Sequence, residues 1–259
     1  MPEPSLSDGA PKNALITGAA RRIGRAIAIR LAASGYAVAI HAHGSVADAE
    51  ALVKEIANSG GRAVLVTGDL ADAAALPELV TQAAARLGPL TLLVNNASTY
   101  EDDAIGSLDS AQWDRQFALN LRAPVFLAEA FAAQAPSDYD CCIINITDQR
   151  VFKPTPRQFS YTLTKGALGL ATLTLAQALA PAIRVNAVAP GPVLPSPRQD
   201  EAAFARQVAA LPLAHGPAPE DIAEAVFYLA TATRVSGVTI AVDGGQHLAW
   251  MTPDAALDE

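Results

Sequence analysis

The chain has 259 residues, enough for one large α/β domain with a sizeable core. It carries 18 Lys and Arg against 26 Asp and Glu, a formal net charge of −8 at pH 7, and an acidic chain without a basic run is a poor nucleic-acid binder. Charged residues make up only 17% of the chain and hydrophobic residues 51%, which predicts unusually extensive burial and therefore a homo-oligomer.

Residues 1–12 carry prolines and acids but no apolar segment, which predicts a flexible tail rather than a signal peptide. The longest apolar runs fall short of the roughly 18 residues that a membrane helix needs. The cysteines, Cys141 and Cys142, are adjacent at the start of an apolar run, which favours buried thiols over a disulfide framework. We therefore expect a cytoplasmic protein that does not bind a membrane.

Short apolar runs alternate with longer segments of helical period along nearly the whole chain. The predicted buried strands are Ala14–Thr17, Ala37–His41, Ala63–Thr67, Leu92–Asn95, Cys142–Ile146, Arg184–Ala187 and Thr239–Val242. The predicted helices are residues 22–34, 46–59, 73–87, 110–134, 158–179 and 219–231. Such alternation makes a parallel sheet that helices cover on both faces.

One stretch departs from this alternation. Pro190–Asp200 contains four prolines and a glycine and is too long for an ordinary connection. Long irregular segments in compact domains commonly carry function. We therefore predict a substrate loop or lid there, at about residues 190–212.

The first predicted strand runs into the small-residue turn Thr17–Gly24, and a helical stretch follows. Small residues let the backbone turn sharply and approach a pyrophosphate, which amide groups and the positive end of a helix then hold. This pattern predicts a dinucleotide site with contacts from Gly18, Ile23 and Gly24. Arg22 stands where a small residue is commoner; it either lies on the surface of the first helical turn or places its donors beside phosphates.

The second predicted strand ends at His41. An NAD site needs an acid here to hold the ribose 2′-hydroxyl, and the first acid, Asp48, falls inside the next predicted helix. NADP(H) is therefore the predicted cofactor, with Arg22, His43 and Ser45 facing its 2′-phosphate. The alternating histidines also fit a plain strand end, and no metal site is expected because no cysteine or acid ligand lies nearby.

The third predicted strand is followed by Asp69 and Leu70. The Asp69 carboxylate is placed to accept the adenine amine of a dinucleotide. An N-cap of the next helix is the competing explanation, and the sequence leaves both open.

Tyr161 and Lys165 lie four residues apart in a helical stretch, so they share one face. A lysine ammonium close to a phenol lowers the pKa of the tyrosine, which predicts that Tyr161 acts as proton donor or acceptor near neutral pH. Asp148 ends the fifth predicted strand. The Tyr-Lys spacing is common by chance, but here the glycine turn, Asn95–Ala97 and Asn120 precede it in a consistent order.

From Ala14 to Leu248 the chain resembles the short-chain dehydrogenase/reductase family. The matching segments are TGAARRIG at 17–24, NNAS at 95–98, Asn120, YTLTK at 161–165, RVNAVAPG at 184–191 and VDGG at 242–245. The resemblance implies a single Rossmann-type doubly wound α/β domain over residues 13–259, with a seven-stranded parallel sheet. It also implies nicotinamide chemistry and a dimer or tetramer.

The resemblance also implies catalytic and cofactor-binding roles for the residues of this chain that match the family's motifs. Tyr161 would be the acid/base, Lys165 would hold the nicotinamide ribose, and Asn120 would position a proton-relay water. The remaining contacts that the resemblance implies for NADP(H) are Asn96, Ala97, Leu70, Pro190 and Gly191.

Two departures from the family pattern resemble its pteridine reductase branch, which includes the bacterial dihydromonapterin reductases. Asp148 stands where the catalytic serine usually is, and Arg22 interrupts the glycine turn. Tyr100 and Ser98 lie where that branch places an aromatic and a serine against the pterin. Gly44 differs from that branch, which commonly has an arginine there for the 2′-phosphate.

A pterin also suits the chemistry of Asp148. An ionised carboxylate beside the tyrosine repels a developing oxyanion, but it accepts the N–H groups of an aminopyrimidinone. We therefore predict NADPH-dependent reduction of a dihydropterin, with Arg22, Ser98, Tyr100, Asp148 and Tyr161 at the substrate.

Two alternatives stay open. One is a carbonyl or alcohol oxidoreductase of the same family, acting on a 3-oxoacyl thioester or a sugar; the other is a non-catalytic dinucleotide sensor. Arg150, Lys153 and Arg157, which follow Asp148, are predicted to be solvated loop charges.

Overall fold

A parallel sheet of seven strands lies at the centre of the computed structural model, which describes residues 11–195 and 199–250. The strands are β1 (Asn13–Ile16), β2 (Ala37–Ala42), β3 (Arg62–Thr67), β4 (Leu92–Asn95), β5 (Cys141–Ile146), β6 (Ile183–Pro190) and β7 (Thr239–Val242). Their order across the sheet is β3-β2-β1-β4-β5-β6-β7, so the direction of winding reverses between β1 and β4. The predicted doubly wound α/β fold is confirmed.

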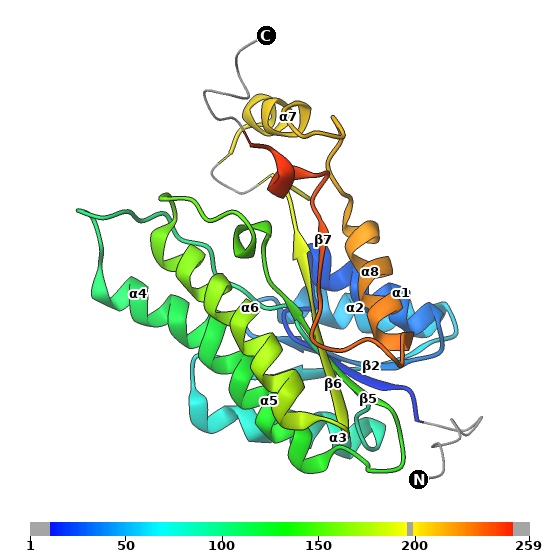
Figure 1. The fold of residues 1–259 in the computed structure, drawn as a ribbon. Helices are drawn as coiled ribbons and strands as arrows, with labels where there is room; N and C mark the ends of the chain where they lie inside the picture. The colour runs from blue at the N-terminus through cyan, green and yellow to red at the C-terminus, as the bar shows by residue number, and fades with distance from the viewer. Residues whose placement is uncertain (1–10, 196–198, 251–259) are drawn as a thin grey trace, which may run out of the picture.

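Helices cover both faces of the sheet (Figure 1). One layer contains α1 (Arg22–Ala33), α2 (Val46–Asn58) and α8 (Pro219–Thr231). The other contains α3 (Leu76–Leu87), α5 (Ala123–Gln134) and α6 (Phe159–Leu179), with α4 (Ser110–Phe117) packed against α6. Within the described ranges, no helix combines the length and the apolar character that a membrane span requires.

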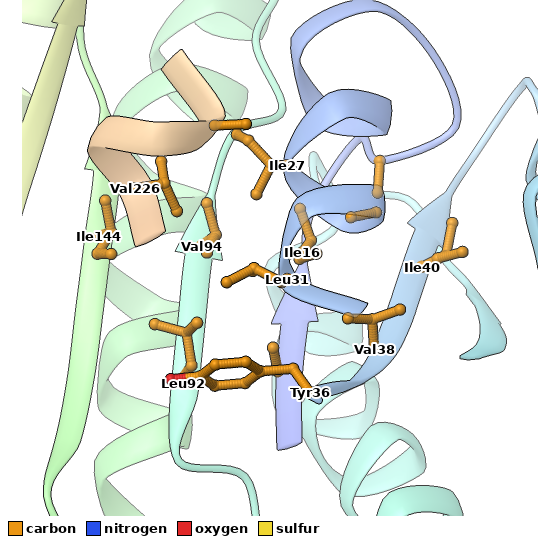
Figure 2. Close-up of a cluster of buried hydrophobic side chains, with 14 of the residues drawn as sticks. Ile16, Ile27, Leu31, Tyr36, Val38, Ile40, Leu92, Val94, Ile144 and Val226 are labelled. Carbon is orange, nitrogen blue, oxygen red and sulfur yellow. The ribbon is translucent and has the colours of Figure 1, made fainter. Parts of the chain in front are cut away.

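The strands are apolar throughout because both of their faces are buried. Successive side chains point to opposite faces, so Ile16 packs beneath α1 while Leu15 packs in the α3–α5 layer. Figure 2 shows the first of these cores, where Ile27 and Leu31 of α1 lie over Val94 on β4. Because both faces are buried, the ends of the strands are the part of the sheet that can reach a ligand.

The chain start differs in part from the prediction. Residues 1–10 of the predicted flexible tail lie outside the described residues. Pro11 and Lys12 do not continue such a tail, because the backbone N–H of Ala37 donates to the Lys12 carbonyl at 2.7 Å and the Thr91 hydroxyl donates to the Pro11 carbonyl at 2.8 Å. Residues 11 and 12 are therefore held against the neighbouring segments before the first strand begins.

Two predicted segments also take a different form. The predicted helix 110–134 is α4 and α5 joined by a π-helical segment, Ala118–Arg122, which carries the buried Asn120. The predicted substrate loop contains a helix, α7 (Glu201–Ala209), which begins where the Asp200 side chain accepts the N–H of Ala203. Pro190 belongs to β6, and the described residues 191–195 and 199 form no helix or strand, as predicted, but the sequence analysis did not predict α7. Residues 196–198 of that loop lie outside the described residues.

The glycine turn after β1 requires small residues for a steric reason. Gly18 has a φ of +60°, in the left-handed region that favours glycine. A Cβ on Gly24 would lie 2.5 Å from Asn96 Nδ2 and closer still to the Gly18 carbonyl oxygen. The turn and the start of α1 are therefore packed without room for one more methyl group.

Gly24→Ala is expected to destabilise the protein by about 1–3 kcal/mol, because overpacking at rigid backbone forces a shift. Urea unfolding at pH 7.5 measures the change. Gly44→Ala is the matched control: a Cβ on Gly44 meets nothing within 4 Å. Equal stability of the two variants would contradict the packing argument.

Candidate active site

A cavity of about 960 Å³ opens at the carboxyl ends of the strands, within the size range of small-molecule sites. In open α/β sheets, ligands bind where the winding reverses, which here is between β1 and β4. Residues from the turn after β1, from the ends of β4, β5 and β6, and from α6 and α7 line it. The predicted site residues among them are Arg22, Ile23, Asn96, Ser98, Tyr100, Asp148, Tyr161, Lys165, Pro190 and Gly191.

The segment after β4 holds the glycine turn in place. Thr17 Oγ1 accepts the backbone N–H groups of Asn96 and Ala97 at 2.9 and 3.0 Å. In return, Asn96 Nδ2 donates to the Thr17 and Gly18 carbonyls at 2.9 and 3.1 Å. The predicted cofactor residues Asn96 and Ala97 thus fix the shape of the turn.

The start of α1 fits a pyrophosphate. Its N-cap residue, Arg21, makes no side-chain capping bond, and its first turn contains no acid. The first amide groups of the helix and its positive dipole end are therefore available to an anion. Gly24 is buried beneath this turn, and its missing Cβ allows the Gly18 carbonyl and the Asn96 side chain to approach closely.

His41 holds the glycine turn in place through a hydrogen bond to Gly18. It is buried, its Nδ1 accepts the Gly18 N–H at 3.2 Å, and its Nε2 lies 3.1 Å from the Gly68 carbonyl, to which it donates. Burial lowers the pKa of His41, which keeps the ring neutral. Both ring nitrogens are engaged, so a structural role accounts for the histidine.

Arg21 and Arg22 reach in different directions. Arg21, with a side chain 64% exposed, donates through Nε to Asp48 at 2.6 Å, in the first turn of α2. It therefore lies beside the loop of His43 and Ser45, the latter at the N-cap of α2. The sequence analysis did not single out Arg21, although it directly precedes Arg22.

Arg22 is not brought together with His43 and Ser45. Its φ is +52°, and its guanidinium donates to the Leu194 and Pro195 carbonyls at 3.1 to 3.2 Å. These carbonyls lie just after β6, whereas His43 and Ser45 lie just after β2, which is four strands away in the sheet. Arg22 thus lines the same cavity as Asp148.

Asp69 and Leu70 follow β3, away from the cavity lining. The Asp69 carboxylate accepts the N–H of Ala71 at 2.8 Å. Asp72, not Asp69, caps the next helical turn, where it accepts the N–H of Ala74 at 3.0 Å. The N-cap explanation for Asp69 therefore does not hold, and its exposed carboxylate remains open to a ligand.

Asp148 and Tyr161 are in direct contact. The Tyr161 hydroxyl donates to Asp148 Oδ2 at 3.1 Å, while Oδ1 accepts the backbone N–H of Arg150 at 2.9 Å and so caps the short helix Gln149–Val151. Burial raises the pKa of Asp148, and the hydrogen bond from the Arg150 amide reduces that shift, as do the charges of Arg150 and Lys165 and the hydrogen bond from Tyr161. Burial and the adjacent carboxylate raise the pKa of Tyr161 well above its ordinary value.

The expected lowering of the Tyr161 pKa by Lys165 is not what the structure shows. The Lys165 ammonium donates to the Ile146 carbonyl at 2.8 Å and lies 5.7 Å from the centre of the tyrosine ring. Burial lowers the pKa of Lys165 itself to about 8. The Asp148 carboxylate touches the phenol and outweighs the more distant ammonium, so Tyr161 keeps its proton at neutral pH.

Asn120 holds the loop that carries Ser98 and Tyr100. Its Oδ1 accepts the Thr99 N–H at 2.8 Å and the Ser98 hydroxyl at 3.1 Å, and its Nδ2 donates to the Thr99 carbonyl at 2.9 Å. The loop presents the Tyr100 ring edge-on to Tyr161, with 4.9 Å between ring centres. The side chain of Asn120 therefore positions the loop on one wall of the cavity.

Arg150 lines the cavity and is largely buried, contrary to the prediction that it is a solvated loop charge, whereas Arg157 lines the cavity but is exposed, as predicted. Arg150 has a side chain only 14% exposed, with its Nε 3.8 Å from Asp148 Oδ1. Lys153 is not among the lining residues and lies over the Trp250 ring. The sequence did contain a signal that Arg150 lies in the cavity, because it follows Asp148 by two residues on the turn after β5.

Comparisons with known proteins agree with this geometry. The family model for short chain dehydrogenases matches residues 12–205. The 3-oxoacyl-[acyl-carrier-protein] reductase FabG of Staphylococcus aureus (strain Mu50) is 33% identical over 242 residues, which cover 92% of this chain and 98% of that protein.

Two solved structures extend the comparison. FolM alternative dihydrofolate reductase 1 from Brucella suis, in complex with NADP, is 52% identical, with a TM-score of 0.91 over 94% of this chain and 98% of that one. A blue fluorescent protein from a metagenomic library, in complex with NADPH, is 36% identical, with a TM-score of 0.85 over 90% of this chain and 97% of that one.

The neutral His41 predicts a pH-dependent contribution to stability. Because its folded-state pKa is lowered, the contribution is complete above the unfolded pKa of about 6.5 and is lost as the pH falls towards the folded pKa. Between pH 7.5 and 6.0, the stability difference between the wild type and His41→Asn should shrink by up to about 1 kcal/mol. A difference that stays constant in urea unfolding at both pH values would contradict this.

Proposed function

Because the chain belongs to the short chain dehydrogenase family, whose model matches residues 12–205, we propose that it reduces a dihydropterin to its tetrahydro form with NADPH. The chain is an oxidoreductase that uses NADP, as do its relatives solved with NADP or NADPH. The observation that carries the proposed substrate is the buried contact between Asp148 and Tyr161. The FolM dihydrofolate reductase of Brucella suis supports the same chemistry.

Asp148 and Tyr161 have different roles at the substrate: Asp148 accepts hydrogen bonds and Tyr161 donates a proton. When bound at the glycine turn, NADPH supplies a hydride to the carbon of the pterin C=N bond. Asp148 uses one lone pair for Tyr161 and one for the Arg150 amide, which leaves further lone pairs for pterin N–H groups. The Tyr161 O–H bond breaks as the ring nitrogen gains its proton, and solvent then returns a proton to the tyrosinate. Because its pKa is high, the Tyr161 phenol is fully protonated at neutral pH and holds the proton that the ring nitrogen takes up.

Other side chains place the pterin between these groups and the cofactor. Tyr100, with 41% of its surface exposed, offers a ring face beside Tyr161 for stacking. Arg22 and Ser98 also line the cavity. The Arg22 guanidinium offers donors, while the Ser98 hydroxyl, which donates to Asn120, offers lone pairs to a pterin N–H group. Lys165, fixed by the Ile146 carbonyl, presents its remaining ammonium protons to the nicotinamide ribose.

Reduction of a carbonyl is the second candidate, since the Staphylococcus aureus FabG is similar over nearly the whole chain. The charge at the site opposes it. A ketone needs a donor beside the tyrosine as its oxygen becomes negative, whereas an ionised Asp148 repels that charge. The two candidates therefore differ in what happens when Asp148 is replaced.

The proposal is tested by following NADPH oxidation with dihydromonapterin, dihydrobiopterin, dihydrofolate and an acetoacetyl thioester in parallel. We expect turnover of pterins and little of the thioester. Asp148→Ser should remove most pterin reduction, and Tyr161→Phe should lower the rate by about 10²–10⁴ with NADPH binding retained. Full pterin activity in Asp148→Ser, or a wild type that reduces only the thioester, would replace this proposal with carbonyl reduction.

NADPH should bind more tightly than NADH, with Arg21 as the main contact of the 2′-phosphate beside His43 and Ser45. Arg21→Ala removes a charge-assisted hydrogen bond of about 1.5–3 kcal/mol, so the NADPH preference should fall roughly 10- to 100-fold. Arg22→Ala is the matched control and should leave the ratio nearly unchanged, because its guanidinium lies over the substrate cavity. Titration of cofactor fluorescence gives both constants, and an unchanged ratio in Arg21→Ala would refute the assignment.

The exposed apolar side chains of α6 support a homodimer or homotetramer. Leu163, Leu170 and Leu173 are 41%, 63% and 49% exposed along one side of the helix. Leu170→Glu should shift the protein to smaller species in light scattering at micromolar concentration, while Leu170→Met should not. A wild type that is monomeric at that concentration would rule the oligomer out.

A further inference from the structure

The burial of Asp148 raises the question of what keeps it ionised. A carboxylate removed from water takes up a proton unless an opposite charge or several donors face it. The proposed role of Asp148, as acceptor of substrate N–H groups, requires the ionised form. Its environment must therefore supply a compensating charge.

The groups around Asp148 come from three elements. From the turn after β5 come the Arg150 amide, at 2.9 Å, and the Arg150 guanidinium, whose Nε lies 3.8 Å from Oδ1. From α6 come the Tyr161 hydroxyl, at 3.1 Å, and the Lys165 ammonium, which donates to Ile146 instead. Tyr100, from the loop after β4, packs on Tyr161 and carries no charge at neutral pH. Arg150 is thus the cation in ion-pair contact with the carboxylate.

The Arg150 guanidinium is fixed in this position. It donates to the Thr162 hydroxyl at 3.1 Å, to Gln158 Oε1 at 3.0 Å and to the Arg157 carbonyl at 3.3 Å. Gln158 is itself held, since its amide donates to Asp102 at 2.8 Å. An arginine with so many partners, and with little exposure, differs from a solvated surface charge.

Arg150 also borders the two aromatic rings of the site. Its guanidinium carbon lies 5.5 Å from the ring centre of Tyr161 and 5.7 Å from that of Tyr100, within the range of cation–π attraction. The same side chain therefore contacts the carboxylate, the proton donor and the stacking ring. A substitution of Arg150 therefore changes the surroundings of Asp148, Tyr161 and Tyr100.

We propose that Arg150 is a positioning residue that keeps Asp148 ionised and its carboxylate directed at Tyr161. The inference rests on the proposed function only for the use that the substrate makes of Asp148. Without the guanidinium, the buried carboxyl takes a proton. It then carries a hydroxyl where an acceptor is needed, and it accepts fewer pterin N–H groups.

The ionisation of Asp148 can be measured without a substrate. In protein with ¹³C-labelled aspartate carboxyls, the Asp148 resonance is assigned by its absence in Asp148→Asn and titrated by NMR. An opposite charge at this distance shifts a carboxyl by about 1–3 pH units, so Arg150→Gln should raise the midpoint by that amount. Arg150→Lys, which keeps the charge, should stay near the wild type. An unmoved midpoint in Arg150→Gln would overturn the proposal.

A second variant covers the case in which Arg150→Gln does not fold. Gln158 has a φ of +48°, so Gln158→Gly relieves backbone strain while it removes one anchor of the guanidinium. A smaller rise of the Asp148 midpoint is expected in this variant. An Asp148 midpoint that does not rise in Gln158→Gly would likewise overturn the proposal.

Kinetics separate this inference from the proposed function. If Arg150 acts through Asp148, Arg150→Gln should lower kcat/KM for dihydropterin about tenfold or more at pH 7 and move the acid limb of its pH profile upwards. In the Asp148→Asn background, the same change should cost little. If no pterin is turned over but the NMR midpoint shifts, the proposed function fails and the inference stands. If pterin is reduced but neither the midpoint nor the acid limb moves, the inference fails alone.

Discussion

The contact between the Asp148 carboxylate and the Tyr161 hydroxyl, buried at the end of β5, is the interaction around which the site is built. Burial and the adjacent carboxylate raise the pKa of the Tyr161 phenol, so Tyr161 keeps its proton at neutral pH. The same carboxylate needs a cation, and Arg150 lies against it. The protonation of Tyr161 and the charge of the cavity wall beside it therefore both depend on the Asp148 carboxylate.

The fold brings this pair to the cofactor through the ends of its parallel strands. Groups far apart in the chain, such as Gly18, Asn96, Asp148 and Gly191, meet because β1, β4, β5 and β6 are neighbours and end at the same edge of the sheet. The rigid core beneath them holds the glycine turn through His41 and Thr17. The sheet thus positions the glycine turn and the residues at its strand ends, and α6 adds Tyr161 and Lys165 to the same cavity.

Periodicity predicted the strands and the order of the elements, and motif spacing together with the family resemblance predicted some of the cavity-lining residues, among them Asp148, Tyr161 and Lys165. Other features depend on side-chain direction, which spacing does not encode. The Arg22 side chain points towards the Leu194 carbonyl, and the Arg150 side chain points into the cavity towards Asp148. The Lys165 ammonium donates to the Ile146 carbonyl and does not lower the pKa of Tyr161. Helix α7 was missed because four prolines dominate the preceding segment, although Asp200 gave a capping signal.

A crystal structure of the protein with NADP⁺ and a dihydropterin, a pair that cannot react forward, tests the account most directly. We predict pterin N–H groups about 2.7–3.2 Å from an Asp148 oxygen and the C=N nitrogen within similar reach of the Tyr161 hydroxyl. A pterin bound with no N–H group at Asp148, or one whose reducible nitrogen faces away from Tyr161, would contradict it.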